Sequence, residues 1–118
     1  MPNSIEVPGL PPNNRTYSQA VLMNGLVYVS GQLGVSGGAD IQSQTRQALE
    51  NIKQILAAAG TSMDKVGKVN IFITDFTLLG QMNEIYGQYF PHRPAKTTVE
   101  ITRLDRDGLI EIEVVAEA

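Results

Sequence analysis

The stretch DIQSQTRQALENIKQILAAAG, residues 40–60, decides the fold class of this chain. Its apolar residues recur with the period of an α-helix and therefore share one face: Ile41, Ala48, Leu49, Ile52, Ile55, Leu56 and Ala59. Asp40 can accept hydrogen bonds from the first free amides of such a helix, and Gly60 stands where helices commonly end. We therefore predict an amphipathic helix whose apolar stripe must be buried against another layer.

Strand-like segments lie on both sides of this helix. Asn24-Gly25 is a favoured two-residue hairpin turn. A second apolar stripe over residues 78–89 predicts a second helix, which Thr77 can cap and Pro91 ends. Asp105 to Gly108 predicts a turn, and the proline-rich residues 1–16 predict an extended loop. The segments that alternate or read as strands are residues 18–23, 26–30, 69–74, 96–104 and 109–116.

The resulting order, ββαβαββ, predicts an α+β fold with both helices on one face of a mixed sheet of four to six strands. The other sheet face is expected to mix apolar and polar side chains: Tyr28, Phe72, Leu109, Val115, Ser30, Asn70, Thr98 and Glu111. That mixture is too apolar for free solvent and too polar for a closed core. A partner subunit that covers this face would explain both properties, and the seam could hold a ligand pocket.

Length and composition limit the possible classes of protein. The 118 residues suffice for one domain, expected over residues 1–118, and 42% of them are hydrophobic, as in folded chains. Charged residues make up 18%, against about 25% in an average soluble chain. This low share favours burial of part of the surface between copies of the chain.

Charge and residue types exclude several kinds of chemistry. The net charge is −3 and no basic patch is present, which disfavours nucleic-acid binding. The absence of cysteine removes disulfides, thiolate nucleophiles and cysteine–zinc sites. Motifs for phosphate loops, dinucleotides, metalloproteases and calcium are absent, so we expect no cofactor and no metal. With no apolar run of roughly 20 residues and no signal-peptide pattern, we expect no membrane contact and a cytoplasmic location.

Carboxylates, lysine, tyrosine, hydroxyls and backbone amides remain as candidates for chemistry. Glu111 and Glu113 share a strand face, where they are either solvated on an edge strand or project into a partly dry cleft. A carboxylate in such a cleft can orient or deprotonate a water molecule. Lys96 could hold a substrate carboxylate, or it could be a surface lysine that protects an edge strand. Tyr17 could wall a pocket or simply pin the N-terminal loop to the core.

Three further positions are weaker candidates by pattern alone. Ser30-Gly31 ends a strand at a glycine, where backbone amides are accessible, although a plain turn explains it equally well. Asn83 lies one step from the apolar stripe of the second helix, where surface exposure is the commoner outcome. His92, the single histidine, stands beside Arg93 in a proline-flanked loop, and such a histidine is more often a surface residue than a ligand.

Seven segments together resemble the Rid family, also called the YjgF or L-PSP family. They run in family order from about Tyr17 to Ala116: TYSQA, VYVSGQL, QTRQALENIKQILAAAG, VNIFITD, MNEIYGQYF, RPAKTTVEI and IEIEVVA. The resemblance implies a chorismate-mutase-like fold in a homotrimer, with the sheets inside, the helices outside and ligand clefts between subunits. It further implies cofactor-independent hydrolysis of reactive enamines and imines, such as 2-aminoacrylate, to a 2-keto acid and ammonia.

The resemblance also implies roles for individual residues. Tyr17 matches a tyrosine that walls the cleft, Ser30 and Gly31 match a serine-glycine turn at the site, and Asn83 matches an asparagine near it. Glu111 matches the glutamate proposed to position the attacking water. Lys96 stands where the deaminase subgroup has arginine, and Thr98 where it often has cysteine. Lysine is a point charge, whereas arginine grips a carboxylate with two parallel hydrogen bonds.

Because Lys96 stands where the deaminase subgroup has arginine, functions other than deamination of 2-aminoacrylate are also possible for this chain. The chain could be a trimer that binds a small carboxylic acid without deaminating it, or it could deaminate a larger unsaturated amine of the aminomuconate type. Ribonuclease activity or translation inhibition, both ascribed to the family in older descriptions, is a more distant alternative because the chain is acidic.

Overall fold

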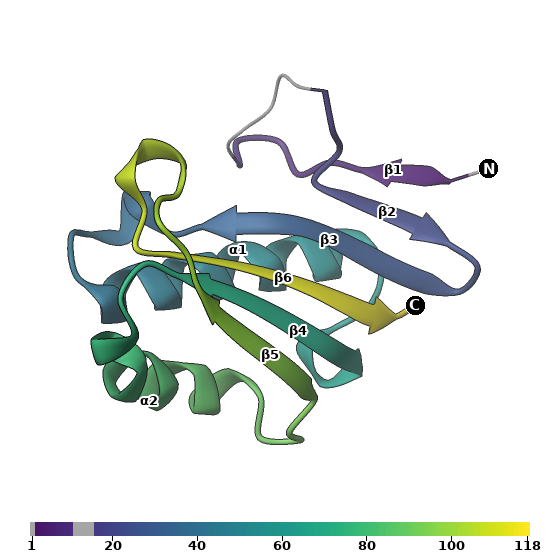
Figure 1. Ribbon diagram of the computed structural model, residues 1–118. Helices are drawn as coiled ribbons and strands as arrows, with labels where there is room; N and C mark the ends of the chain where they lie inside the picture. Colours follow the sequence, from purple (N-terminus) through teal and green to yellow (C-terminus); the bar gives the residue numbers. More distant parts are fainter. Residues whose placement is uncertain (1, 11–15) are drawn as a thin grey trace.

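One mixed sheet of six strands carries both helices on the same face (Figure 1). The computed structural model describes residues 2–10 and 16–118. Across the sheet the strands run in the order β1-β2-β3-β6-β4-β5. The strands are β1 (Asn3–Ile5), β2 (Ala20–Met23), β3 (Leu26–Leu33), β4 (Val66–Ile73), β5 (Ala95–Glu100) and β6 (Ile110–Glu117), and the helices are α1 (Ile41–Ala58) and α2 (Leu79–Tyr89). This arrangement confirms the predicted α+β fold.

The helix predicted from residues 40–60 is α1. The Asp40 side chain accepts a hydrogen bond from the Ser43 amide at 2.7 Å, which is the predicted N-cap. Gly60, just beyond the helix, has φ +85°, a conformation that glycine adopts without steric cost. The apolar stripe is buried against β3, β6 and α2, with Leu49, Ile52, Ile55 and Leu56 fully buried.

The Asn24-Gly25 hairpin is also confirmed. Asn24 and Gly25 have φ values of +54° and +78°, as a two-residue turn between antiparallel strands requires. Val27 and Val29 face the helices, whereas Tyr28 is 39% exposed on the other face. The prediction of a loop over residues 1–16 is wrong for Asn3–Ile5, which pairs with β2 as the edge strand β1. Residues 1 and 11–15 of that predicted loop lie outside the described part of the chain.

The second helix begins differently from the prediction. A short 3-10 turn, Phe76–Leu78, precedes α2, and its cap is Asp75, whose carboxylate accepts from the Thr77 amide at 2.9 Å. Thr77 is therefore the capped residue and not the cap. Aspartate is among the strongest N-cap residues, so it begins the helical turn two residues earlier than the apolar stripe indicates. The stripe itself is buried at Met82, Ile85 and Tyr86.

The register of β5 places Thr98 on the sheet face opposite to the predicted one. Thr98 pairs with Ile71 of the parallel strand β4, and Ile71 is 1% exposed in the core. Residues opposite each other on paired strands share a sheet face, so Thr98 faces the helices. The prediction that Thr98 lies on the open face beside Glu111 is therefore wrong. Strand β5 also ends at Glu100, four residues before the predicted end.

Candidate active site

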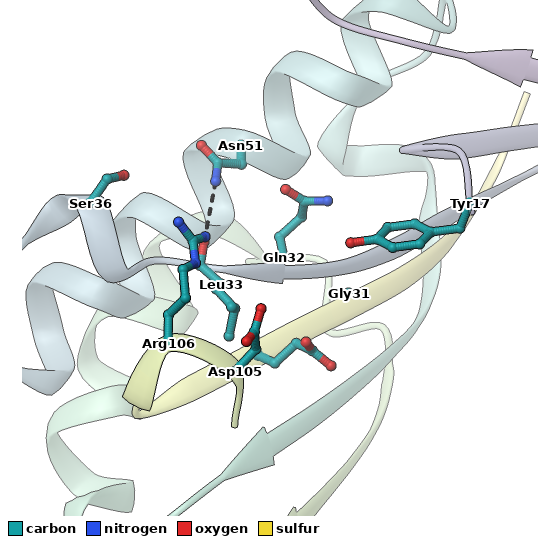
Figure 2. A pocket seen from close by; sticks show the side chains of 9 residues that line it. Tyr17, Gly31, Gln32, Leu33, Ser36, Asn51, Asp105 and Arg106 are labelled. Atoms are coloured by element: carbon teal, nitrogen blue, oxygen red, sulfur yellow. Dashed lines mark hydrogen bonds between the residues drawn. The ribbon is translucent and has the colours of Figure 1, made fainter. Parts of the chain in front are cut away.

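A cleft of about 300 Å³ opens where β3, β6 and the turn before β6 meet (Figure 2). It brings together three of the predicted site residues, Tyr17, Gly31 and Glu111, within one chain. In Figure 2 the Tyr17 ring enters from the side opposite Arg106. The remaining lining residues are Gln32, Leu33, Ser36, Asn51, Asp105 and Arg106.

Glu111 is held on a central strand. Strand β6 pairs with β3 on one side and β4 on the other, and Glu111 lies between Leu33 and Phe72. The alternative of a glutamate solvated on an edge strand is therefore wrong. Burial raises the pKa of the half-buried Glu111 carboxyl above its usual value of 4.5, and the negative charges of Glu113 and Asp105 raise it further. Such a group exchanges protons more readily near neutral pH than an exposed glutamate does.

Gly31 allows Glu111 to take this position. The ladder between β3 and β6 shifts register between Val29 and Gln32, so the backbone bulges at Ser30 and Gly31. A Cβ atom added at Gly31 would lie 2.6 Å from Cδ of Glu111 and 2.7 Å from its Oε2. Only a residue without a side chain leaves room for this carboxylate to lie over the bulge. The prediction that the strand ends at Ser30-Gly31 is therefore wrong, because β3 continues through the bulge to Leu33. The bulge is the floor beneath Glu111.

Ser30 lies beside the cleft and fixes the chain near Tyr17. Its hydroxyl donates to the Ser18 carbonyl at 2.7 Å, and its amide donates to the Gln19 carbonyl at 2.9 Å. The Gln19 side chain, which is 3% exposed, donates to the Leu10 carbonyl at 2.8 Å and accepts from the Val7 amide. Tyr17 is itself 51% exposed, so its ring is free to contact a ligand at the mouth of the cleft.

The other predicted residues form a second cluster on α2 and β5. The Lys96 ammonium donates to Asn83 Oδ1 at 3.2 Å and lies 4.6 Å from the centroid of the Tyr86 ring. Burial raises the pKa of Tyr86 to about 12, so its phenol stays neutral. Both partners of the ammonium are therefore uncharged. Among the described residues, the one ion pair within 4.0 Å joins Lys65 and Glu117, which leaves Lys96 without a carboxylate.

Thr98 presents its backbone at this same cluster. The Ile101 amide donates to the Ile73 carbonyl of β4 at 2.9 Å. Because successive amides of a strand point to opposite edges, the Thr98 amide points away from β4, toward the free edge of the sheet. The Thr98 hydroxyl and the Tyr86 hydroxyl are buried and have no hydrogen-bond partner within the described chain. An outward amide beside a lysine ammonium is suited to binding an anion.

The two clusters lie on opposite faces of the sheet. Glu111 is opposite Phe72, which in turn is opposite Val99, on the open face. Lys96 is opposite Val69, which is fully buried beneath the helices. One chain therefore does not bring Lys96 to Glu111. Arg93, the neighbour of His92, is exposed on the turn after α2. His92 Nε2 lies 2.9 Å from the Val66 carbonyl, outside the cleft.

Several residues that line the cleft were not predicted from the sequence. Asn51 is 4% exposed on α1 and donates to the Leu33 carbonyl at 3.3 Å. Asp105 and Arg106 belong to a turn that the sequence analysis treated only as a connection. The turn directly precedes the strand of Glu111, and that adjacency was the available signal. Gln32 is buried because the bulge shifts the alternation of β3, which no simple pattern reveals.

The described part of the chain offers little to hold a metal ion or cross a membrane. Within residues 2–10 and 16–118, no three histidine, aspartate or glutamate side chains lie close enough together to bind a metal ion. No helix among those residues has the length and apolar character that a membrane span requires.

Comparison with known sequences finds one family over nearly the whole chain. The model of the family described as Endoribonuclease L-PSP matches residues 10–118. A RutC family protein of Pyrococcus horikoshii is 43% identical over 107 residues, which cover 85% of both chains. The protein of Escherichia coli named "Putative reactive intermediate deaminase TdcF" is 38% identical over 109 residues, covering 85% of this chain and 84% of its own.

Comparison with solved structures gives the same result. The Rid family protein YyfA of Yersinia pestis has a TM-score of 0.93 at 41% identity, with both chains fully covered. Escherichia coli TdcF, solved with bound serine, has a TM-score of 0.91 at 36% identity and 98% coverage of both chains.

Proposed function

Since this chain belongs to the Rid, or L-PSP, family, we propose that it hydrolyses reactive enamines and imines of the 2-aminoacrylate type. The observation that carries the proposal is the half-buried Glu111, whose carboxylate lies over the Gly31 bulge in a cleft walled by Tyr17. The reaction gives a 2-keto acid and ammonia. The name of TdcF and its bound serine support a small amino-acid-like ligand.

The site is proposed to form between copies of the chain in a homotrimer. One copy supplies Tyr17, Ser30, Gly31 and Glu111, and a neighbour supplies Asn83, Lys96 and the Thr98 amide. Two observations support this division. The two clusters lie on opposite faces of the sheet, and the face without helices exposes Tyr28 by 39% and Val99 by 40%. A second copy would cover these apolar side chains.

The proposed mechanism needs only positioning and proton transfer. The imine form of the substrate is already electrophilic, and its carboxylate is held by the Lys96 ammonium and the Thr98 amide. Glu111 accepts a proton from a water molecule as the water oxygen bonds to the imine carbon. Glu111 then returns the proton to nitrogen, which gives a carbinolamine. It next takes the proton of the new hydroxyl group and passes it to the amine nitrogen as the carbon–nitrogen bond breaks and the carbon–oxygen double bond forms, so that the products are ammonia and the keto acid. Tyr17 shields the reacting carbon from bulk water.

Replacement of Glu111 tests this function. In Glu111→Ala, the release of ammonia from enzymatically generated 2-aminoacrylate should fall by about 10²–10⁴-fold toward the spontaneous rate, because the proton relay is lost. Glu117→Gln, on the same strand and face but exposed, is the matched control and should keep the wild-type rate. Ammonia release by Glu111→Ala at the wild-type rate would refute the role of Glu111.

One observation favours a second function, binding of a small acid without turnover. The Lys96 ammonium is already bound to Asn83 and Tyr86, and the family resemblance implies an arginine at this position in the deaminase subgroup. A point charge in that position can hold a carboxylate without the alignment that two parallel hydrogen bonds impose. A thermal shift with keto acids and no acceleration of ammonia release would select this function.

Ribonuclease activity receives no support from the site. Two carboxylates, Glu111 and Asp105, line the cleft with a single guanidinium, and the chain carries a net charge of −3. An RNA backbone would meet repulsion there, because nucleic-acid affinity depends on neutralising several phosphates.

A further inference from the structure

The cleft holds more negative than positive side chains, and its one positive side chain has no role in the proposed reaction. Glu111 and Asp105 contribute two carboxylates, and Arg106 is the one cation among the lining residues. Within the described chain, Arg106 has no carboxylate within 4.0 Å, since the one ion pair at that distance is Lys65–Glu117. The guanidinium is therefore available to an anion that enters the cleft. In the proposed mechanism the substrate carboxylate is bound elsewhere, at Lys96, so Arg106 is a second cation.

Arg106 is exposed and extends into the cleft from a tight turn. Arg106 and Asp107 have φ values of +54° and +55°, a conformation that residues other than glycine rarely adopt. The Gly108 amide closes the turn onto the Asp105 carbonyl at 3.1 Å. Gly108 packs so tightly that an added Cβ would lie 3.0 Å from Cδ2 of Leu33, itself a lining residue. In Figure 2 the guanidinium reaches from this turn toward Asn51, on the side of the cleft away from Tyr17.

The charges that line the cleft bear on which substrate it accepts. Glu111 and Asp105 would repel a second carboxylate unless a cation compensated for them. Arg106 supplies that cation, and its planar fork matches a carboxylate.

We propose that Arg106 binds a second acidic group of the substrate and makes the site selective for imino or enamine dicarboxylates. This inference rests on the proposed deamination and names the substrate class within it. Arg106 acts as a specificity residue that touches the substrate, while Glu111 remains the proton-transfer group.

The test compares two imines made by amino-acid oxidases, 2-iminopropanoate and 2-iminoglutarate. The wild-type chain should hydrolyse 2-iminoglutarate with the higher kcat/KM. Arg106→Gln should lower that value by about 10–100-fold and change the value for 2-iminopropanoate by less than about twofold, since one charge-assisted contact is lost. Arg103→Gln is the matched control, because Arg103 lies next to the same turn but does not line the cleft, and it should leave both values unchanged.

The outcomes separate this inference from the proposed function. An equal loss for both imines in Arg106→Gln, or no loss for 2-iminoglutarate, would overturn the role of Arg106 while leaving deamination intact. If the wild-type chain accelerates neither imine, the proposed function fails, and calorimetry with 2-oxoglutarate and pyruvate then decides about Arg106 alone. Weaker binding of 2-oxoglutarate but not of pyruvate by Arg106→Gln would support the second anion site, and unchanged binding of both would refute it.

Discussion

The cleft around Glu111 and the cluster around Lys96 hold their charged groups in opposite ways. Glu111 is half-buried on a central strand, with its carboxylate over a glycine. Burial raises the pKa of this carboxyl, and two negative groups raise it further. Lys96 is exposed on the edge strand and bound to the neutral Asn83 and Tyr86. A buried carboxylate with a raised pKa is suited to proton transfer, and an exposed cation without a counter-ion is suited to anion capture. The difference supports the proposal that the two clusters are halves of one site, since a single chain keeps them on separate faces of the sheet.

Of the substitutions that test this difference, Gly31→Ala should lower the rate most, because it disturbs the cleft around Glu111 and leaves the cluster around Lys96 intact. The new Cβ would meet Cδ of Glu111 at 2.6 Å and displace the carboxylate. A misplacement of about 1 Å can cost about a hundredfold in rate, so kcat should fall by about 10–100-fold while keto-acid binding at Lys96 is kept. Steady-state kinetics and calorimetry measure the two effects.

Gly67→Ala is the matched control for that experiment. Gly67 also lies in a strand, β4, but an added Cβ there has no atom within 4 Å. The control should keep its kcat. If Gly31→Ala and Gly67→Ala have equal rates, close packing of Glu111 on the bulge is not needed for turnover. The claim that the cleft around Glu111 and the cluster around Lys96 have different tasks would then fail.

Lys96→Arg should have the next largest effect, in the opposite direction. Arginine adds a second charge-assisted hydrogen bond to the substrate carboxylate, so kcat/KM should rise by about tenfold. The gain should appear mainly in KM, because the proton relay at Glu111 is untouched. A variant with no gain would show that the lysine is matched to a different anion, which favours the acid-binding alternative.

Glu113→Gln should have the smallest effect on the rate and should change only the pH dependence that Glu111 sets. Glu111 must be ionised to accept a proton from water, so the rate should rise with pH through its raised pKa. Removal of the Glu113 charge takes away one cause of that raised pKa, so the acid limb of the profile should move to lower pH. A pH–rate profile of kcat/KM measures the shift. Movement to higher pH would mean that Glu113 acts on another group.

The sequence predicted those parts of the fold that local pattern controls. The bounds of α1 follow from Asp40, the apolar stripe and Gly60, all within a few residues of one another. The hairpin at Asn24-Gly25 is equally local. Strand β1 was missed because its three residues are ordered by pairing with β2, and such pairing leaves no trace in composition. Thr98 was given the wrong face because a strand's alternation does not show which set of residues faces the core.

The candidate site was predictable only where the family resemblance named its residues. Tyr17, Gly31 and Glu111 line one cleft, as a shared site requires. The placement of Arg106 depends on how the turn folds back onto Leu33, and the buried Gln32 depends on the bulge in β3. Both are consequences of tertiary packing that neighbouring residues in the sequence do not encode.

Mixing two inactive variants tests most directly whether two copies build the site. Glu111→Gln and Lys96→Ala should each be nearly inactive as pure proteins. In trimers reassembled from equal amounts, an intact site forms wherever a Lys96→Ala copy supplies Glu111 and a Glu111→Gln copy supplies Lys96, so roughly a quarter of wild-type activity should return. Activity that stays at the level of the pure variants, with trimers of both chains present, would contradict a site shared between neighbouring copies.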